Sequence, residues 1–195
     1  MATNIEIEAK VLIEEEGFEK IKQLYEDYAN SAYIQTNYYI DTPNFDLRKN
    51  GVGLRIRSYE NKYVMTLKTP LSEGLLEKTE TISKEEYKEM RDSNVFPDNK
   101  IKSFLIMLGF EIEQLKILTK LRTERIDISF ETGLFSIDRH EYQCKVDYEL
   151  EKESNNLKSG EDFLVNICTK AGIKFQINKS TKQARAFNRL AELSK

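Results

Sequence analysis

The amino-acid sequence predicts an α+β protein that is mainly β, with a closed eight-stranded antiparallel barrel and helices packed outside it. Three observations support this prediction. Runs of alternating polar and apolar residues recur along the 195-residue chain, and helical spacing is found between or after those runs. The order of helices and strands is also too irregular for a parallel doubly wound sheet. At this length we expect a single domain, residues 1–195.

The first strand is predicted at residues 4–13, where charged and apolar residues alternate. Glu6, Glu8 and Lys10 share one side of this run, so one face of the strand is charged and the other is apolar. Apolar residues then recur at helical spacing among Glu and Lys, which predicts a helix over 14–30.

The remaining elements follow the same two patterns. Strands are predicted at 33–41, 52–59, 62–69, 74–82, 119–130, 133–140 and 145–153. Helices are predicted at 84–92, 98–109, 158–171 and 181–193. Short turns such as Glu60-Asn61 join neighbouring strands, which favours antiparallel pairing.

Composition and charge narrow the possible functions. The chain has 30 Lys and Arg residues against 33 Asp and Glu residues, so neither sign dominates and no nucleic-acid partner is expected. The N-terminus lacks the apolar segment of a signal peptide, and no run of about 18 apolar residues could cross a membrane. We therefore expect a cytoplasmic protein without a membrane partner, as a monomer or homodimer. Cys144 and Cys168 have no partner at zinc spacing and are expected to be free thiols.

Charged residues on the predicted strands are segregated by sign. Arg55 and Arg57 share one face of their strand, whereas the last strand carries a ladder of carboxylates. That ladder consists of Asp147, Glu149, Glu151 and Glu153. Such ladders can be the solvated outer face of a sheet. Alternatively, helices cover the apolar faces, and a barrel of about eight strands encloses the charged faces in a polar interior.

A cavity lined by both signs has a chemical meaning. Converging carboxylates suit hard divalent cations such as Mg²⁺ or Mn²⁺, and Arg and Lys suit phosphate oxygens. The expected ligand is therefore a metal-complexed polyphosphate. Phosphoryl transfer depends on positioning and on neutralisation of charge, which this lining would provide.

Motifs along nearly the whole chain also resemble those of the CYTH domain family, or triphosphate tunnel metalloenzymes. The motifs are Glu6-Ile7-Glu8-Ala9-Lys10, Tyr39-Ile40-Asp41-Thr42, Leu54-Arg55-Ile56-Arg57, Thr66-Leu67-Lys68, Glu80, Thr123-Glu124-Arg125, Ile137-Asp138, Tyr148-Glu149-Leu150-Glu151, and Lys182 before Arg185. This family includes class IV adenylate cyclases, thiamine triphosphatases and inorganic triphosphatases. The resemblance implies a tunnel of eight antiparallel strands that holds a linear triphosphate.

The resemblance also implies roles for individual residues. The residues expected to bind the triphosphate are Lys10, Arg55, Arg57, Lys68, Arg125 and Lys182, with Glu80 as an inward acidic residue that supports the basic wall. The expected metal ligands are Glu6, Glu8, Asp138, Glu149 and Glu151. The residues expected to act in catalysis are Glu6, Glu8, Lys68, Glu149 and Glu151. Strand alternation independently places Arg125 on the polar face, and Arg122 is the alternative if the register slips.

The expected function is metal-dependent hydrolysis of a small linear triphosphate, with inorganic tripolyphosphate as the favoured substrate. A class IV adenylate cyclase, a thiamine triphosphatase and a non-catalytic module that binds polyphosphate or a nucleotide remain open alternatives. His140, the only histidine, shares a strand face with Asp138. It is interpreted either as a general base or as a polar residue with satisfied hydrogen bonds at the tunnel rim.

Overall fold

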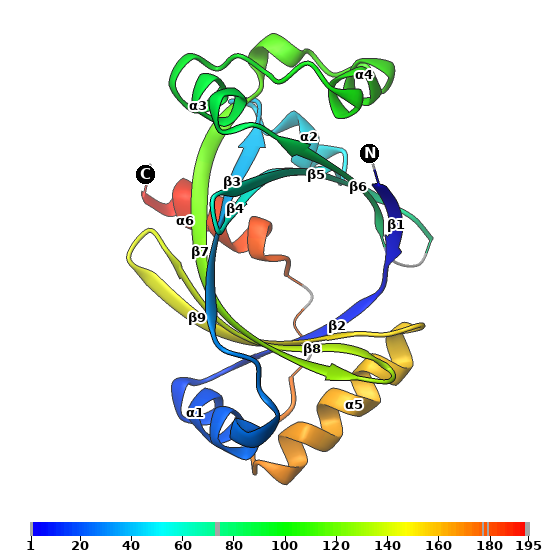
Figure 1. Ribbon diagram of the computed structural model, residues 1–195, viewed down its shortest axis with the longest axis vertical. Coiled ribbons are helices and arrows are strands. Elements are labelled where there is room, and N and C mark those ends of the chain that lie inside the picture. Colours follow the sequence, from blue (N-terminus) through cyan, green and yellow to red (C-terminus); the bar gives the residue numbers. More distant parts are fainter. Residues whose placement is uncertain (1, 73–74, 177, 179, 194–195) are drawn as a thin grey trace. The chain divides into compact units, whose positions relative to one another are not determined.

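The computed structural model describes residues 2–72, 75–176, 178 and 180–193 (Figure 1). The side chains of Asn4 and Glu6 lie outside this description. The described residues form a nine-stranded, mainly antiparallel sheet and six α-helices, so the predicted α+β class is confirmed. The strands are β1 (Ala2–Glu6), β2 (Glu8–Ile13), β3 (Tyr33–Asp41), β4 (Gly53–Tyr59), β5 (Lys62–Pro70), β6 (Leu75–Ile82), β7 (Lys116–Phe130), β8 (Gly133–Tyr142) and β9 (Lys145–Glu153).

The hydrogen-bonded strand order is β1-β6-β5-β4-β3-β7-β8-β9-β2. The single strand predicted at 4–13 is therefore two strands, β1 and β2, which are separated by Ile7 and pair with β6 and β9 respectively. Because β1 and β2 end the order, hydrogen bonds among the described residues do not close the sheet. This finding corrects the predicted closed eight-stranded barrel in strand number and in closure. One uninterrupted period-two pattern cannot reveal that its two halves have different partners.

The helices mostly follow the predicted segments. They are α1 (Glu15–Leu24), α2 (Asp46–Lys49), α3 (Lys84–Ser93), α4 (Lys100–Met107), α5 (Leu157–Lys170) and α6 (Lys182–Leu193), with 3₁₀ turns at Glu26–Tyr28 and Ile112–Gln114. The helix predicted at 14–30 ends early at Leu24, and the short α2 was not predicted. None of the helices in the described ranges is long and apolar enough to cross a membrane.

The chain divides into two compact units. The first unit comprises Met1–Glu6, Gln35–Leu121 and Ala186–Lys195, and the second comprises Ile7–Ile34 and Arg122–Arg185. Each unit has its own apolar core on one face of its strands.

In the first unit, α3 and α4 cover one face of the strands (Figure 1). Met65 and Leu67 of β5 are fully buried there with Met90 of α3 and Leu105 of α4. The helix α3 begins at a capping box, in which Ser83 accepts a hydrogen bond from the backbone of Glu86 and the Glu86 carboxylate accepts one from the backbone of Ser83. Thr66 and Lys68 of β5 therefore lie on the opposite, polar face of the sheet.

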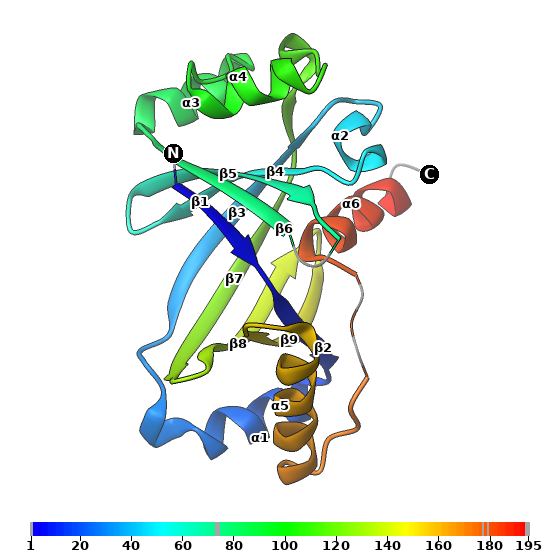
Figure 2. The ribbon, with the colours of Figure 1, turned by 90° about the vertical axis from the view of Figure 1, so that its right-hand side faces the viewer.

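In the second unit, α1 and α5 pack on strands β2, β8 and β9 (Figure 2). The core contains Phe18 of α1, Ile137 of β8 and Leu150 of β9. Gly160 allows α5 to approach β2 closely, because a Cβ atom at this position would lie 2.9 Å from the Cβ atom of Ala9. The opposite face of these strands carries the charged residues that the sequence singled out.

Candidate active site

A cluster of buried charged side chains lies on the polar face of the second unit's strands. The register brings it together, because Arg125 pairs with Asp138, Asp138 pairs with Glu149, and Lys10 pairs with Glu151. Leu150, which lies between Glu149 and Glu151, belongs to the core, as do Ile126 and Ile137, which neighbour Arg125 and Asp138 in sequence. We call the following residues the acid–base cluster: Lys10, Arg125, Asp138, His140, Glu149, Glu151, Lys182 and Arg185.

Two basic side chains bridge the carboxylates of this cluster. Arg125 donates hydrogen bonds from Nε and Nη2 to the two oxygens of Asp138, at 2.7 and 2.6 Å, and Nη2 also donates to Glu151 at 2.6 Å. Lys182, the first residue of α6, places Nζ 2.8 Å from Asp138 Oδ2 and 2.6 Å from Glu151 Oε2. The same ammonium is 3.8 Å from Glu149 Oε2, so it contacts three carboxylates.

Glu149 is held on both oxygens. Arg185 Nη1 donates to Oε1 at 2.9 Å and Nη2 donates to Oε2 at 3.1 Å. Asn178 Nδ2 also donates to Oε1, at 2.6 Å. His140 Nε2 lies 3.2 Å from Oε2. This number of partners fixes the orientation of the Glu149 carboxylate within the cluster.

The basic partners keep the three carboxylates ionised despite their burial. Burial alone would raise the pKa of Asp138, but Arg125 and Lys182 outweigh it and lower that pKa to about 2. Burial is likewise opposed at Glu149, where the hydrogen bond from His140 and the charge of Lys182 lower the pKa to about 2. At Glu151, Lys182 and Arg125 overcome burial and hold the pKa well below its usual range.

The cluster has three carboxylates, those of Asp138, Glu149 and Glu151, and four basic groups, those of Lys10, Arg125, Lys182 and Arg185; Lys10 is also paired with Glu8. Burial opposes the charge of Lys182, but Asp138 and Glu151 raise its pKa above the ordinary value. A buried ion pair contributes stability only when both partners are present, because an unpaired buried charge is costly. The cluster is thus balanced as long as each charge keeps a partner of the opposite sign.

The donor set of this cluster fits a divalent cation. One ligand atom from each of Asp138, His140 and Glu149 lies within 4.8 Å of the others. The Lys182 ammonium, in contact with three carboxylates, stands in for a bound cation. The cluster can therefore hold a positive centre, and carboxylate oxygens are the ligands that Mg²⁺ and Mn²⁺ accept.

The structure brings together most of the predicted site residues that belong to the second unit. Lys10, Arg125, Asp138, Glu149, Glu151 and Lys182 are all in the cluster. Glu8 contacts it through Lys10, whose Nζ donates to Glu8 Oε1 at 2.6 Å. Burial lowers the pKa of Lys10, but Glu8 and Glu151 outweigh it, and the net shift is upward. The side chain of Glu6 lies outside the described residues, so its predicted role stays a prediction.

Three predicted basic residues share the polar face of the first unit. Arg55 of β4 pairs with Thr66, and Lys68 of β5 pairs with Gly53 and Glu77 in the strand register. The Lys68 ammonium forms an ion pair with Glu77 at 3.1 Å. Arg57 follows Arg55 on the same face of β4. Their predicted role in binding phosphate stays a prediction.

Glu80 lies on the opposite face from these basic residues. It pairs with Met65, a core residue, and its carboxylate accepts a hydrogen bond from the backbone nitrogen of Lys100 at 3.2 Å. This position at the N-terminus of α4 stabilises the helix. The expectation that Glu80 points to the basic wall is therefore corrected, and Glu77 is the acidic residue of β6 that meets Lys68.

The register also decides between two candidate arginines. Arg125 is buried in the cluster, whereas Arg122 is half-exposed and pairs with Glu141 at 3.0 Å. His140 is fully buried and has a partner at each ring nitrogen, so its hydrogen bonds are satisfied as expected, although it does not lie at an exposed rim.

Sequence analysis named Arg185 in a motif without listing it as a site residue, and it missed other residues of the site. Arg185 and Asn178 orient Glu149, and Thr123 lies 2.9 Å from His140 Nδ1. In the first unit, Asn37 Oδ1 accepts a hydrogen bond from Arg57 Nε at 3.0 Å. The signal for Asn37 and Thr123 was available, because each lies on the charged face of its predicted strand.

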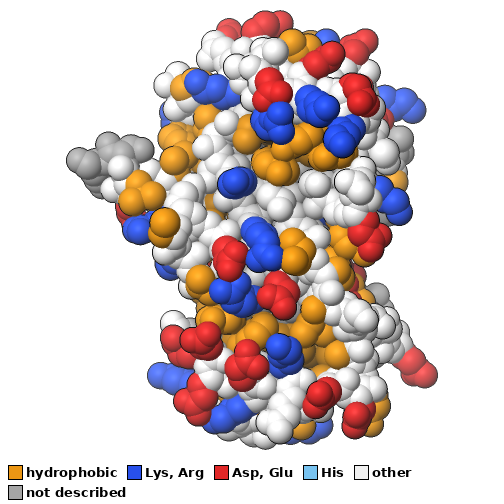
Figure 3. All heavy atoms as spheres, turned by 60° about the vertical axis from the view of Figure 1, so that its left-hand side comes forward, with side chains coloured by type: hydrophobic (Ala, Val, Ile, Leu, Met, Phe, Trp, Pro, Cys, Tyr) orange, Lys and Arg blue, Asp and Glu red, His pale blue; other side chains and the backbone are white. Residues whose placement is uncertain are grey.

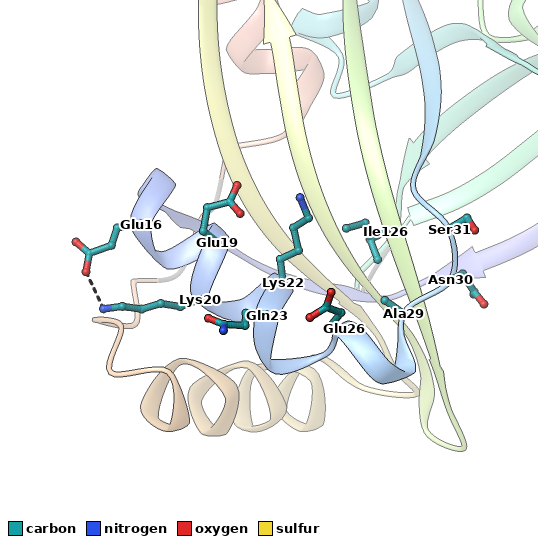
Figure 4. Close-up of a pocket in the computed structure, with 10 residues that line it drawn as sticks. All are labelled: Glu16, Glu19, Lys20, Lys22, Gln23, Glu26, Ala29, Asn30, Ser31 and Ile126. Atoms are coloured by element: carbon teal, nitrogen blue, oxygen red, sulfur yellow. Dashed lines mark ion pairs between the residues drawn. The ribbon is translucent and has the colours of Figure 1, made fainter.

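An open groove follows α1 in the second unit and is lined by side chains of both signs, including the ion pair of Glu16 with Lys20 at 2.7 Å (Figure 4). It lies on the helix-covered side of the strands, away from the acid–base cluster. Acidic, basic and hydrophobic side chains are also interspersed on the face in Figure 3.

Comparisons with known proteins agree with this geometry. The chain is 32% identical over 160 residues to the Bacillus subtilis protein named "Putative triphosphatase YjbK". The matched residues make up 82% of this chain and 83% of that protein. A Bacillus halodurans structure described as a "putative adenylate cyclase" is 33% identical, with a TM-score of 0.87 over 96% of this chain and 100% of that one. A Hippeastrum protein described as a "putative adenylyl cyclase" with a dominant triphosphatase activity has the same fold, with 22% identity and a TM-score of 0.80 over 94% of this chain and 96% of that one.

The family model of the CYTH domain matches residues 4–185. That range includes every residue of the acid–base cluster and all the motifs on which the resemblance was based. The chain belongs to the CYTH domain family.

Proposed function

We propose that this protein is a divalent-metal-dependent triphosphatase that hydrolyses a linear triphosphate, with inorganic tripolyphosphate as the favoured substrate and Mg²⁺ or Mn²⁺ as the cofactor. The observation that carries the proposal is the buried cluster in which Asp138, Glu149 and Glu151 are paired with Arg125, Lys182 and Arg185. The relative named as a triphosphatase supports the same reaction class.

The balance of charge explains how this cluster could accept its substrate. The buried carboxylates and the buried basic groups pair with one another in the free protein. With a metal–triphosphate complex bound, the basic groups would pair with phosphate oxygens and the carboxylates would hold the cation. Each buried charge would then keep a partner of opposite sign, which would avoid the large cost of an isolated buried ion.

The roles of individual residues follow from their charge. Lys10, Arg125 and Lys182 would bind phosphate oxygens and neutralise the charge that develops in the transition state. Asp138, Glu149 and Glu151 would hold the cation, with Arg185 and Asn178 fixing the orientation of Glu149. A bound divalent cation would neutralise phosphate charge and polarise the attacking water. Arg55, Arg57 and Lys68 of the first unit are proposed as further phosphate ligands.

A substrate panel tests the proposal. Release of inorganic phosphate should be measured with tripolyphosphate, ATP, thiamine triphosphate and pyrophosphate, each in Mg²⁺ or Mn²⁺ and with excess chelator. We expect turnover of tripolyphosphate that the chelator abolishes, and slower turnover of pyrophosphate because it lacks one phosphate group for the basic residues to bind. Turnover that is unchanged by the chelator, or no turnover of any triphosphate, would contradict the proposal.

Adenylate cyclase activity is the second candidate, because a structure that is 33% identical is described as a "putative adenylate cyclase". In that reaction the ribose 3′ hydroxyl of ATP replaces water as the nucleophile. Cyclic AMP should therefore be measured in the same ATP reactions. Formation of cyclic AMP without net phosphate release from tripolyphosphate would favour the cyclase over the triphosphatase.

A further inference from the structure

His140 is a buried group to which the proposed reaction assigns no task. It is the only histidine in the chain, and its side chain is 0% exposed. Its ring nitrogens have different surroundings. Nδ1 lies 2.9 Å from Thr123 Oγ1, whereas Nε2 lies 3.2 Å from Glu149 Oε2 and 3.6 Å from Asp138 Oδ2. One nitrogen therefore faces a neutral hydroxyl and the other faces two carboxylates.

We propose that His140 Nε2 is a direct ligand of the divalent cation, together with Asp138 and Glu149. This inference rests on the proposed metal-dependent function. Donor atoms that bind one ion at about 2.0–2.2 Å lie about 3 Å apart when they are neighbours around it. The separations of Nε2 from Glu149 Oε2 and from Asp138 Oδ2 are close to this spacing.

Thr123 allows the imidazole to change its hydrogen-bond role. One neutral tautomer would place the proton on Nε2, facing Glu149, and would let Nδ1 accept a hydrogen bond from Thr123. Coordination through Nε2 requires its lone pair and therefore the other neutral tautomer, in which Nδ1 carries the proton and donates to Thr123 Oγ1. A hydroxyl can donate in the first state and accept in the second, which a backbone carbonyl could not do.

A nitrogen ligand also sets the class of cation. Carboxylate and water ligands suit Mg²⁺ and Mn²⁺, whereas imidazole suits ions such as Fe²⁺, Ni²⁺ and Zn²⁺. A site of two carboxylates and one imidazole should therefore bind Fe²⁺ or Ni²⁺ more tightly, relative to Mg²⁺, than a site of carboxylates alone.

The single histidine permits a direct test in the unaltered chain. Untagged protein should be prepared with ¹⁵N-labelled histidine and loaded with Mn²⁺, alone and with the inert analogue imidotriphosphate. We expect pulsed electron paramagnetic resonance to show a ¹⁴N coupling to Mn²⁺ in unlabelled protein and a ¹⁵N coupling in labelled protein. Bound Mn²⁺ without a histidine coupling would overturn the inference, as would a failure of Mn²⁺ to bind under both conditions.

Two variants separate a metal ligand from a residue that merely positions Glu149. His140→Gln should weaken Ni²⁺ binding at least tenfold and Mg²⁺ binding less than threefold, because imidazole suits Ni²⁺ and carboxylate or water ligands suit Mg²⁺. Equal losses for the two ions would indicate positioning and contradict the inference. Thr123→Val should keep the nitrogen coupling, because it removes the hydroxyl and leaves the imidazole. Circular dichroism of both variants checks the fold.

The two proposals can fail separately. Chelator-sensitive release of phosphate without a histidine coupling would leave the triphosphatase standing and remove His140 as a ligand. A histidine coupling to Mn²⁺ without turnover of any triphosphate would keep His140 as a metal ligand and contradict the proposed triphosphatase activity.

Discussion

Asn37 shows how one residue can organise part of a binding face. Its side chain is 1% exposed, and Oδ1 accepts the hydrogen bond from Arg57 Nε. Because that nitrogen can only donate, the contact fixes which way the amide points. Asn37 Nδ2 is then a buried donor without a hydrogen-bond partner among the described residues. An unpaired buried donor costs about 1–3 kcal/mol, which a phosphate oxygen at this position would recover.

Substitution of Asn37 should therefore affect substrate capture. Asn37→Ala removes the acceptor that orients Arg57 and should raise KM for tripolyphosphate about fivefold to tenfold, with a smaller change in kcat. Asn37→Asp keeps an acceptor but adds a negative charge, so KM should rise further. Steady-state kinetics of both variants check this order. An unchanged KM in Asn37→Asp would place Asn37 away from the substrate.

Because the pKa values of Asp138 and Glu149 are lowered in the folded protein, the free energy of unfolding depends on pH in the acid range. Each carboxyl has a folded-state pKa of about 2, below the unfolded values of about 4. Stability from this difference is fully present above pH of about 4.5 and is lost as the pH falls toward 2. The free energy of unfolding in denaturant should therefore fall steeply between those limits. A flat profile over this window would contradict the ion pairing described for the cluster.

At the scale of the element, α6 supplies the internal cation of the cluster. Lys182→Met removes the ammonium that contacts Asp138, Glu149 and Glu151, and leaves these carboxylates with one neighbouring cation fewer. We expect Mn²⁺ to bind about tenfold more tightly in the absence of phosphate, because the competing charge is gone. Turnover of tripolyphosphate should nevertheless fall, about a hundredfold, because a phosphate ligand is lost. Calorimetry and phosphate release measure the two effects.

Lys170→Met is the matched control for this variant. Lys170 ends α5 and is exposed, so removal of its charge tests the general effect of one lost cation. Weaker binding of Mn²⁺ in Lys182→Met, or an equal gain in both variants, would contradict the role of Lys182 as a local competitor.

Element boundaries were predicted well where one face is apolar and the other is polar. The strands at 33–41 and 145–153 coincide with β3 and β9. In β6 both faces carry polar residues, so alternation could not show which face is covered. Lys78 lies over the ring of Phe104 at 4.8 Å, and Glu80 meets the start of α4, so polar groups pack under helices there. The resemblance implied that Glu80 points inward, whereas the strand register places it on this helix-covered face.

At the scale of the whole molecule, the order of the motifs predicted which residues lie on the polar faces of the strands better than it predicted which of them form ion pairs. Six predicted residues meet in the second unit, while Arg55, Arg57 and Lys68 share a face of the first. Sequence spacing could not show that Lys182 and Arg185, far along the chain, pair with Asp138 and Glu149. Those pairs depend on where α6 begins relative to the strands, which no local pattern records.

The most direct test compares two carboxylates of the same strand. Glu151 is buried and paired with Arg125 and Lys182, whereas Glu153, two residues later, is exposed. Removal of one partner from a buried ion pair costs about 3 kcal/mol or more, so Glu151→Gln should be assayed at a temperature where circular dichroism shows it folded.

Under those conditions, Mn²⁺-dependent phosphate release from tripolyphosphate should be measured for Glu151→Gln and Glu153→Gln alongside the unaltered chain. We predict a loss of at least a hundredfold in kcat/KM for Glu151→Gln and a change of less than twofold for Glu153→Gln. Full activity in a folded Glu151→Gln variant would contradict the assignment of the acid–base cluster as the active site.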